Sequence, residues 1–122
     1  MIRIYKHYKF LKWMKKLRVS DLDLKNAILE IEQGLVDADL GQGVLKKRIA
    51  VNGRGKRGGA RTIIAFRLDH RAVFIYGFGK NEKETLSPSD EAHLKQLAKI
   101  YLKFSEEKMK QAVKIDELME VI

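Results

Sequence analysis

The chain has 122 residues, which is enough for one domain with a modest core and too few for two. Its 25 lysines and arginines outnumber its 16 aspartates and glutamates, so the formal net charge is +9, while 45% of the residues are apolar. This composition excludes a disordered tail, and the absence of cysteine excludes disulfides, cysteine-containing zinc sites and thiol catalysis.

The hydrophobic segments are all short. The longest apolar run lies around residues 62–66, far below the roughly 20 residues that a membrane helix needs. The N-terminus shows no apolar stretch of the kind found in signal peptides. We therefore expect no membrane segment and a cytoplasmic location, with which the lack of cysteine agrees.

The first third of the chain predicts two helices in succession. Apolar residues at i, i+3, i+4 and i+7 predict an amphipathic helix within the first 18 residues, at Phe10, Trp13, Met14 and Leu17. We expect Phe10 and Trp13 to anchor the core, and a short strand over residues 2–6 is the alternative for the start of the chain. Ser20 is a typical N-cap for a second helix, and Gly34 is typical of the position after a helix end.

The middle of the chain predicts a sheet. A turn over residues 40–43 comes first, and the glycine-rich residues 52–59 form a loop. Three segments have the composition of strands, namely residues 44–51, 60–68 and 71–78. Because only Asp69–His70 separates the last two segments, we predict an antiparallel hairpin there.

The last third predicts helices again. Ser87 and Pro88 are typical N-cap and N1 residues, and Ser105 begins a final helix, so residues 105–122 read as a C-terminal helical extension. The expected fold is therefore one α+β domain over residues 1–122, with an N-terminal helical hairpin, an antiparallel sheet of three or four strands and C-terminal helices. Helices at both ends of such a sheet are expected to cover one of its faces and leave the other open.

The positive charge is concentrated in the middle of the chain. Residues 40–68 contain no acidic residue and eight basic ones: Lys46, Lys47, Arg48, Arg54, Lys56, Arg57, Arg61 and Arg67. A solvated basic surface is the simplest explanation of a charge run. A cluster without any neutralising carboxylate is better explained by a polyanionic partner such as nucleic acid.

Strand alternation predicts where these side chains point. Lys46 and Arg48 share one side of their strand, and Arg61 and Arg67 share one side of the next. In the third strand the residues of one parity are Tyr76, Phe78 and Lys80. If the registers agree, one open face carries several cations and two aromatic rings for base stacking; the alternative is that Tyr76 and Phe78 belong to the core.

Other chemistries have little support in the sequence. The three histidines, His7, His70 and His93, lack metal-ligand spacing, and His70 and His93 are expected at the surface. The glycine-rich loop lacks the Gly-Lys-Ser/Thr of a nucleotide-binding loop. We therefore expect no metal or cofactor. A site of cations suits transfer of an RNA phosphodiester to its own 2′-hydroxyl, because arginine and lysine stabilise the charge that develops, and a lysine of lowered pKa can take the hydroxyl proton.

Three motifs in order, over residues 45–50, 55–63 and 76–82, resemble the RelE/ParE superfamily of toxins from type II toxin–antitoxin systems. The closest branch is the HigB-like, RelE-family toxins. The resemblance implies a small α+β fold similar to microbial ribonucleases, ribosome-dependent cleavage of mRNA that inhibits translation, and a cognate antitoxin, often a helix-turn-helix protein. The alternative is a nucleic-acid-binding toxin without catalysis, or a ParE-like toxin that acts on gyrase.

The resemblance also assigns roles to residues. The expected catalytic set is Arg61, Lys80, Lys56, Arg57 and Arg48. The expected RNA-binding set is Lys46, Lys47, Arg54, Arg67, Tyr76, Phe78 and Asn81. Many RelE toxins have arginine where this chain has Asn81, and a tyrosine within the stretch that here reads Thr85-Leu86-Ser87. The group that activates the 2′-hydroxyl is therefore open between a lysine and the ribosome.

Overall fold

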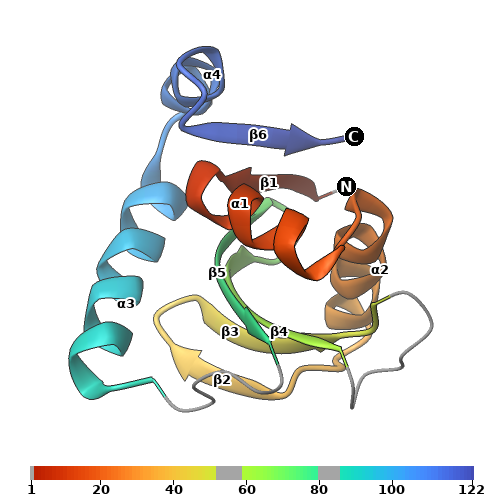
Figure 1. Ribbon diagram of the computed structural model, residues 1–122. Helices are drawn as coiled ribbons and strands as arrows, with labels where there is room; N and C mark the ends of the chain where they lie inside the picture. The colour runs from red at the N-terminus through yellow and green to blue at the C-terminus, as the bar shows by residue number, and fades with distance from the viewer. Residues whose placement is uncertain (1, 52–58, 80–85) are drawn as a thin grey trace.

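The chain forms a mixed sheet with helices on both of its faces, as the computed structural model shows (Figure 1). The structure describes residues 2–51, 59–79 and 86–122, and within these ranges there are four helices and six strands. In chain order they are β1 (Arg3–His7), α1 (Tyr8–Leu17), α2 (Asp21–Glu32), β2 (Ala38–Gly41), β3 (Val44–Ile49), β4 (Ala60–Arg67), β5 (Arg71–Gly79), α3 (Pro88–Lys103), α4 (Glu106–Lys114) and β6 (Leu118–Val121).

The sheet has the strand order β2-β3-β4-β5-β1-β6. The predicted hairpin of β4 and β5 is present, and β3 pairs with β4 in the same antiparallel sense. The α+β class is confirmed, but the predicted number of strands is too small. Strand β1 pairs in parallel with β5, so the sheet is not purely antiparallel. Residues 2–6 thus follow the alternative reading as a strand, and the turn predicted over 40–43 is reduced to Gln42–Gly43 between β2 and β3.

Helix starts agree closely with the sequence signals. Ser20, Ser87 and Ser105 are the N-caps of α2, α3 and α4, and each side chain accepts a hydrogen bond from a backbone N–H in the first turn. Gly34 follows the end of α2 with a φ of +89°, the left-handed conformation that favours glycine. The short helices therefore begin and end where local hydrogen bonding dictates.

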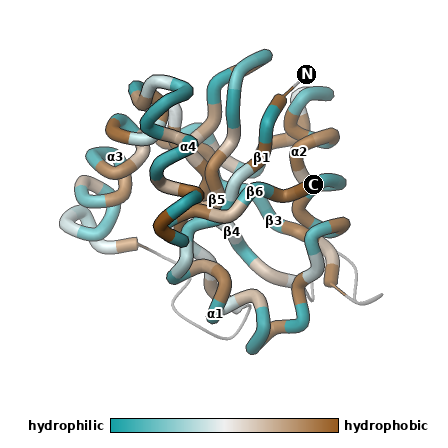
Figure 2. Tube along the Cα trace, turned by 90° about the horizontal axis from the view of Figure 1, so that it is seen from above, coloured by the Kyte–Doolittle hydropathy of each residue, from teal (hydrophilic) through white to brown (hydrophobic). Residues whose placement is uncertain are grey.

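Two separate clusters of buried side chains lie on the two faces of the sheet. One contains residues of α1 and α2, such as Phe10 and Leu24, and the other contains residues of α3 and α4, such as Leu94 and Met109. Seen from above, α3 and α4 lie on one side of the sheet and α2 on the other (Figure 2). The expectation of one fully open face is therefore wrong, because the chain has two pairs of helices and each pair buries its own apolar stripe.

The C-terminal segment is only partly helical. Helix α4 ends at Lys114, and residues 118–121 form β6, which pairs antiparallel with β1 at the edge of the sheet. The predicted helical extension over 105–122 is thus wrong beyond Lys114. Leu118 and Val121 are buried, so this strand contributes to the core.

Candidate functional site: a cationic sheet surface and an adjoining cleft

The strand registers place basic and aromatic residues side by side on the sheet face that α3 covers in part. Directly paired residues of β3, β4 and β5 point to the same face. One row consists of Arg48, Arg61 and Phe78, and the next consists of Lys46, Ile63 and Tyr76. We call these two rows the cationic surface. The registers therefore place five residues on one face of the sheet, as predicted: Lys46, Arg48, Arg61, Tyr76 and Phe78.

The two aromatic residues of the cationic surface differ in exposure. Tyr76 is 40% exposed, whereas Phe78 is 1% exposed and belongs to the core. Their ring centroids lie 5.9 Å apart, and the ammonium of Lys46 lies 6.0 Å from the centroid of Phe78. The prediction that Phe78 stacks on RNA bases is contradicted by its burial, while Tyr76 has the exposure that stacking needs.

Arg48 is held by a carboxylate from the loop before β2. Its Nε donates to Oδ1 of Asp37 at 2.9 Å, and its backbone N–H donates to the other carboxylate oxygen. Burial would raise the pKa of Asp37, but these two hydrogen bonds and the charge of Arg48 outweigh it, so the pKa lies below its usual value. Asp37 stays ionised and fixes Arg48 in place, and the ion pair offsets part of the positive charge of the surface.

Arg61 and Arg67 are separated along β4. Arg61 is half-buried and its guanidinium lies 3.5 Å from the carbonyl oxygen of Gly59. Arg67 is exposed and points to the same face, but six residues further along the strand, roughly 20 Å away. The sequence correctly predicts their common side, yet Arg67 lies at the other end of the sheet and is not part of the cationic surface.

Lys47 points to the opposite face of the sheet. Its side chain is 3% exposed, and its ammonium lies 2.7 Å from Oε1 of Glu30 in α2. This position contradicts the prediction that Lys47 contacts RNA. The alternation of the strand already separated Lys47 from Lys46 and Arg48, but the sequence did not reveal that a helix carboxylate covers it.

The remaining predicted site residues lie outside the residues that the structure describes. They are Arg54, Lys56, Arg57, Lys80 and Asn81. The described chain ends on either side of them at Val51, Gly59 and Gly79, and Ala60 pairs with both Ile49 and Gly79. The described residues Gly59 and Gly79 therefore lie at the end of the sheet that carries the row of Arg48, Arg61 and Phe78.

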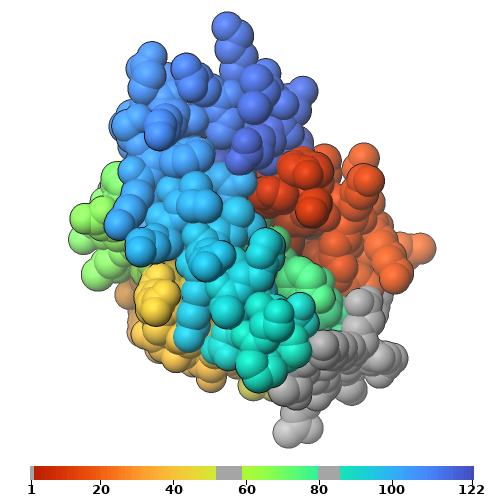
Figure 3. Space-filling model, turned by 90° about the vertical axis from the view of Figure 1, so that its left-hand side faces the viewer, coloured from red at the N-terminus to blue at the C-terminus, as the bar shows by residue number. Residues whose placement is uncertain are grey.

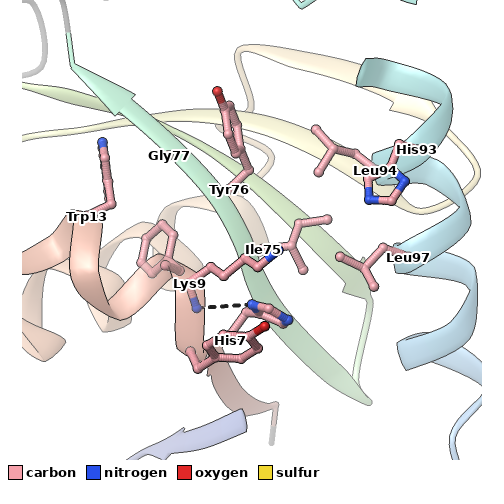
Figure 4. Close-up of a pocket in the computed structure, with 11 residues that line it drawn as sticks. His7, Lys9, Trp13, Ile75, Tyr76, Gly77, His93, Leu94 and Leu97 are labelled. Atoms are coloured by element: carbon pink, nitrogen blue, oxygen red, sulfur yellow. Dashed lines mark hydrogen bonds between the residues drawn. The ribbon is translucent and has the colours of Figure 1, made fainter. Parts of the chain in front are cut away.

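A cleft of about 500 Å³ adjoins the cationic surface at Tyr76. It lies between α1 and α3 with β5 as its floor, and Figure 3 shows atoms of β5 at the surface between these helices. Trp13 forms one wall, Leu94 and Leu97 form the other, and both His7 and His93 line it (Figure 4). No pattern in the sequence indicates this cleft, because His7 and His93 line it together only through the packing of α1 and α3 around β5.

His7 is the N-cap of α1 and is buried. Its Nδ1 accepts a hydrogen bond from the backbone N–H of Lys9 at 3.2 Å, so the neutral ring carries its proton on Nε2 (Figure 4). Burial lowers the pKa of His7, and nearby Glu117 opposes this shift. Of the two histidines expected at the surface, His93 is exposed and His70 is partly exposed. His7, for which no such position was predicted, is 7% exposed.

These features define the class of protein: a small α+β protein whose sheet presents lysine, arginine and tyrosine side by side at one end. A family described as the RelE toxin of the RelE / RelB toxin-antitoxin system matches residues 2–121. The chain therefore belongs to the RelE toxin family and is a toxin of a toxin–antitoxin system with a cognate antitoxin. No curated protein sequence matches it. Among the described residues, no helix is long and apolar enough to span a membrane.

Proposed function

We propose that this toxin is an endoribonuclease that cleaves mRNA on the ribosome and so inhibits translation. The observation that carries this proposal is the register that sets Arg48 opposite Arg61 and Lys46 in the neighbouring row. Three cationic side chains gathered at one end of a sheet face suit a polyanionic substrate, and Asp37 offsets only part of their charge. Family membership supports it, since the described RelE family acts as a toxin.

The proposed reaction needs a concentrated positive charge. The 2′-oxygen of a ribose attacks the adjacent phosphorus, the bond from phosphorus to the 5′-oxygen breaks, and a 2′,3′-cyclic phosphate and a 5′-hydroxyl result. A base takes the proton of the 2′-hydroxyl, and the leaving 5′-oxygen gains one. Arg61 and Arg48, with Lys56, Arg57 and Lys80, stabilise the negative charge that grows on the phosphoryl oxygens in the transition state.

Substrate positioning falls to residues around this centre. Lys46, Arg54 and Asn81 contact the RNA backbone, and Tyr76 stacks on a base. From the motif pattern we also propose that the chain belongs to the HigB-like branch and that its antitoxin is a helix-turn-helix protein. Sequencing of the DNA around the toxin gene tests this assignment, with an adjacent open reading frame for a helix-turn-helix protein as the expected result.

Brief induction in growing bacteria tests the proposal. We expect growth arrest, and new 5′ ends within coding regions when mRNA is mapped by primer extension. Arg61→Ala is expected to abolish both effects. Growth arrest with intact mRNA and accumulated gyrase–DNA cleavage complexes overturns the proposal in favour of a ParE-like activity, and normal growth overturns it outright.

A further inference from the structure

We propose that the cleft between α1 and α3 is a binding site for one unstacked nucleobase of the RNA, next to the cationic surface that holds the backbone. This inference rests on the proposed function, because it names a second part of the same substrate site. It concerns the cleft alone, which has no part in the proposed bond cleavage.

The shape and lining of the cleft suit a flat aromatic ligand. Its volume of about 500 Å³ lies within the range of small-molecule sites, and Trp13 and Tyr76 both line it. Figure 4 shows Trp13 and Tyr76 on either side of Gly77 of β5, with Leu94 and Leu97 of α3 facing them across the cleft. Bases in single-stranded RNA are held in this way, by stacking on aromatic side chains between apolar walls.

The position of the Trp13 ring at one side of the cleft is fixed by its contact with Gly77 of β5. A Cβ atom at Gly77 would lie 2.5 Å from the indole ring, so the absence of a side chain there lets Trp13 pack directly on β5. Phe10 supports the indole from the core side, with ring centroids 5.0 Å apart. The cleft is therefore preformed and needs little reorganisation to accept a ring.

One side chain of the lining also offers a hydrogen-bond donor to a ligand. His7 lines the cleft and uses Nδ1 to cap α1, which leaves Nε2–H as its donor. The carbonyl oxygens and ring nitrogens of a base are acceptors for such a group, whereas an aliphatic side chain has none.

The cleft continues into the cationic surface. Tyr76 lines the cleft and also stands in one row with Lys46, whose ammonium lies over the ring of Phe78 beside it. A ribose–phosphate backbone running along Lys46 and Arg61 thus brings its next base to the mouth of the cleft. An acidic antitoxin peptide fits the cations but makes no use of the aromatic walls, so we favour a base.

The single tryptophan of the chain makes the cleft directly observable. The full-length chain is titrated at low salt with a 2′-O-methyl hexanucleotide, which cannot be cleaved, while Trp13 fluorescence and the anisotropy of a dye on the RNA are recorded. We expect saturable quenching at the concentrations at which anisotropy rises. An oligomer of the same length with abasic sites is expected to bind without quenching.

Variants separate the cleft from the cationic surface. Leu97→Asp places a charge on the α3 wall of the cleft, outside the two rows of the cationic surface, and is expected to weaken RNA binding about tenfold and to abolish the quenching, while Leu97→Met retains both. Leu68→Ala, an exposed residue in the β4–β5 turn, is the matched control and is expected to bind as the wild type. Thermal unfolding of each variant confirms that it folds.

Two results overturn the inference while leaving the proposed function intact. One is RNA binding that depends on Arg61 but leaves Trp13 fluorescence unchanged and is unaffected by Leu97→Asp. The other is quenching caused by a peptide of the antitoxin and not by RNA. Absence of RNA binding in both signals contradicts the proposed function as well.

Discussion

The ion pair of Lys47 and Glu30 allows a quantitative test of which basic residues lie on the face of the cationic surface and which lie on the opposite face. The Lys47 side chain is 3% exposed, and Oε1 of Glu30 lies 2.7 Å from its ammonium. In Glu30→Gln the ammonium stays buried without a carboxylate. Such a loss costs about 3–5 kcal/mol when both partners are buried, and the lower end applies because 31% of the Glu30 side chain is exposed. We therefore expect a loss of about 3 kcal/mol and a fall in Tm of roughly 10 °C.

The matched variant is Lys47→Met, which keeps an unbranched apolar stem and removes the charge. Replacing a buried charge by an apolar residue of similar length is often neutral, so we expect a change within about 1 kcal/mol. In the Lys47→Met background, Glu30→Gln is expected to cost under about 1 kcal/mol. Urea unfolding followed by far-UV circular dichroism measures all four proteins, and the same variants are tested for growth arrest.

The account also predicts that Lys47→Met remains as toxic as the wild type, because Lys47 lies on the face opposite Arg48 and Arg61. Two outcomes contradict this reasoning. One is a Lys47→Met protein that folds normally but has lost toxicity, which returns Lys47 to the RNA site. The other is equal destabilisation by Glu30→Gln in both backgrounds, which shows that the ion pair is not the cause.

Three further variants test other parts of the structure. Burial lowers the pKa of His7 below its unfolded value of about 6.5, so the unfolded state binds the proton more readily, and stability should fall as the pH drops below about 6.5. His7→Asn keeps a capping acceptor but cannot take up a proton, so the urea midpoint should change less between pH 7.5 and about pH 5.5 than in the wild type. A pH dependence equal to that of the wild type refutes this. Arg71→Met leaves the two carbonyl oxygens at the end of α3 that Arg71 binds without a hydrogen-bond donor. It should lower the free energy of unfolding in urea by about 3 kcal/mol, and a loss below about 1 kcal/mol contradicts this role of Arg71. Gly77→Ala should displace Trp13 and shift its fluorescence emission, at a cost of about 1–3 kcal/mol, and an unchanged spectrum is the contrary result.

The features that follow local rules were predictable from the sequence. Serine caps marked the starts of α2, α3 and α4, because an N-cap depends on residues within one turn. Alternation along β3 separated Lys46 and Arg48 from Lys47, because successive side chains of a strand point to opposite faces. These local rules were enough to recover the α+β class and the shared side of the cationic residues.

The features that depend on distant partners were not predictable. β6 is a short strand that exists by pairing with β1, so its segment carries no strong pattern of its own. A strand over residues 2–6 was only the alternative prediction, because β1 depends on its pairing with β5 and β6. The burial of Phe78 depends on residues packed over it, which alternation does not reveal. The cleft needs α1 and α3 to approach β5 from different parts of the chain, and for that reason His7 and His93 read as isolated residues.

The most direct test of the central claim is the cleavage of ribosome-bound mRNA by the purified full-length chain. The account predicts fragments that end in a 2′,3′-cyclic phosphate, at a single-turnover rate that Arg61→Ala lowers about 100-fold or more, while Lys47→Met leaves the rate unchanged. Cleavage that proceeds equally fast in Arg61→Ala, or a wild-type chain that leaves the mRNA whole, contradicts the claim that the cationic surface is a ribonuclease centre.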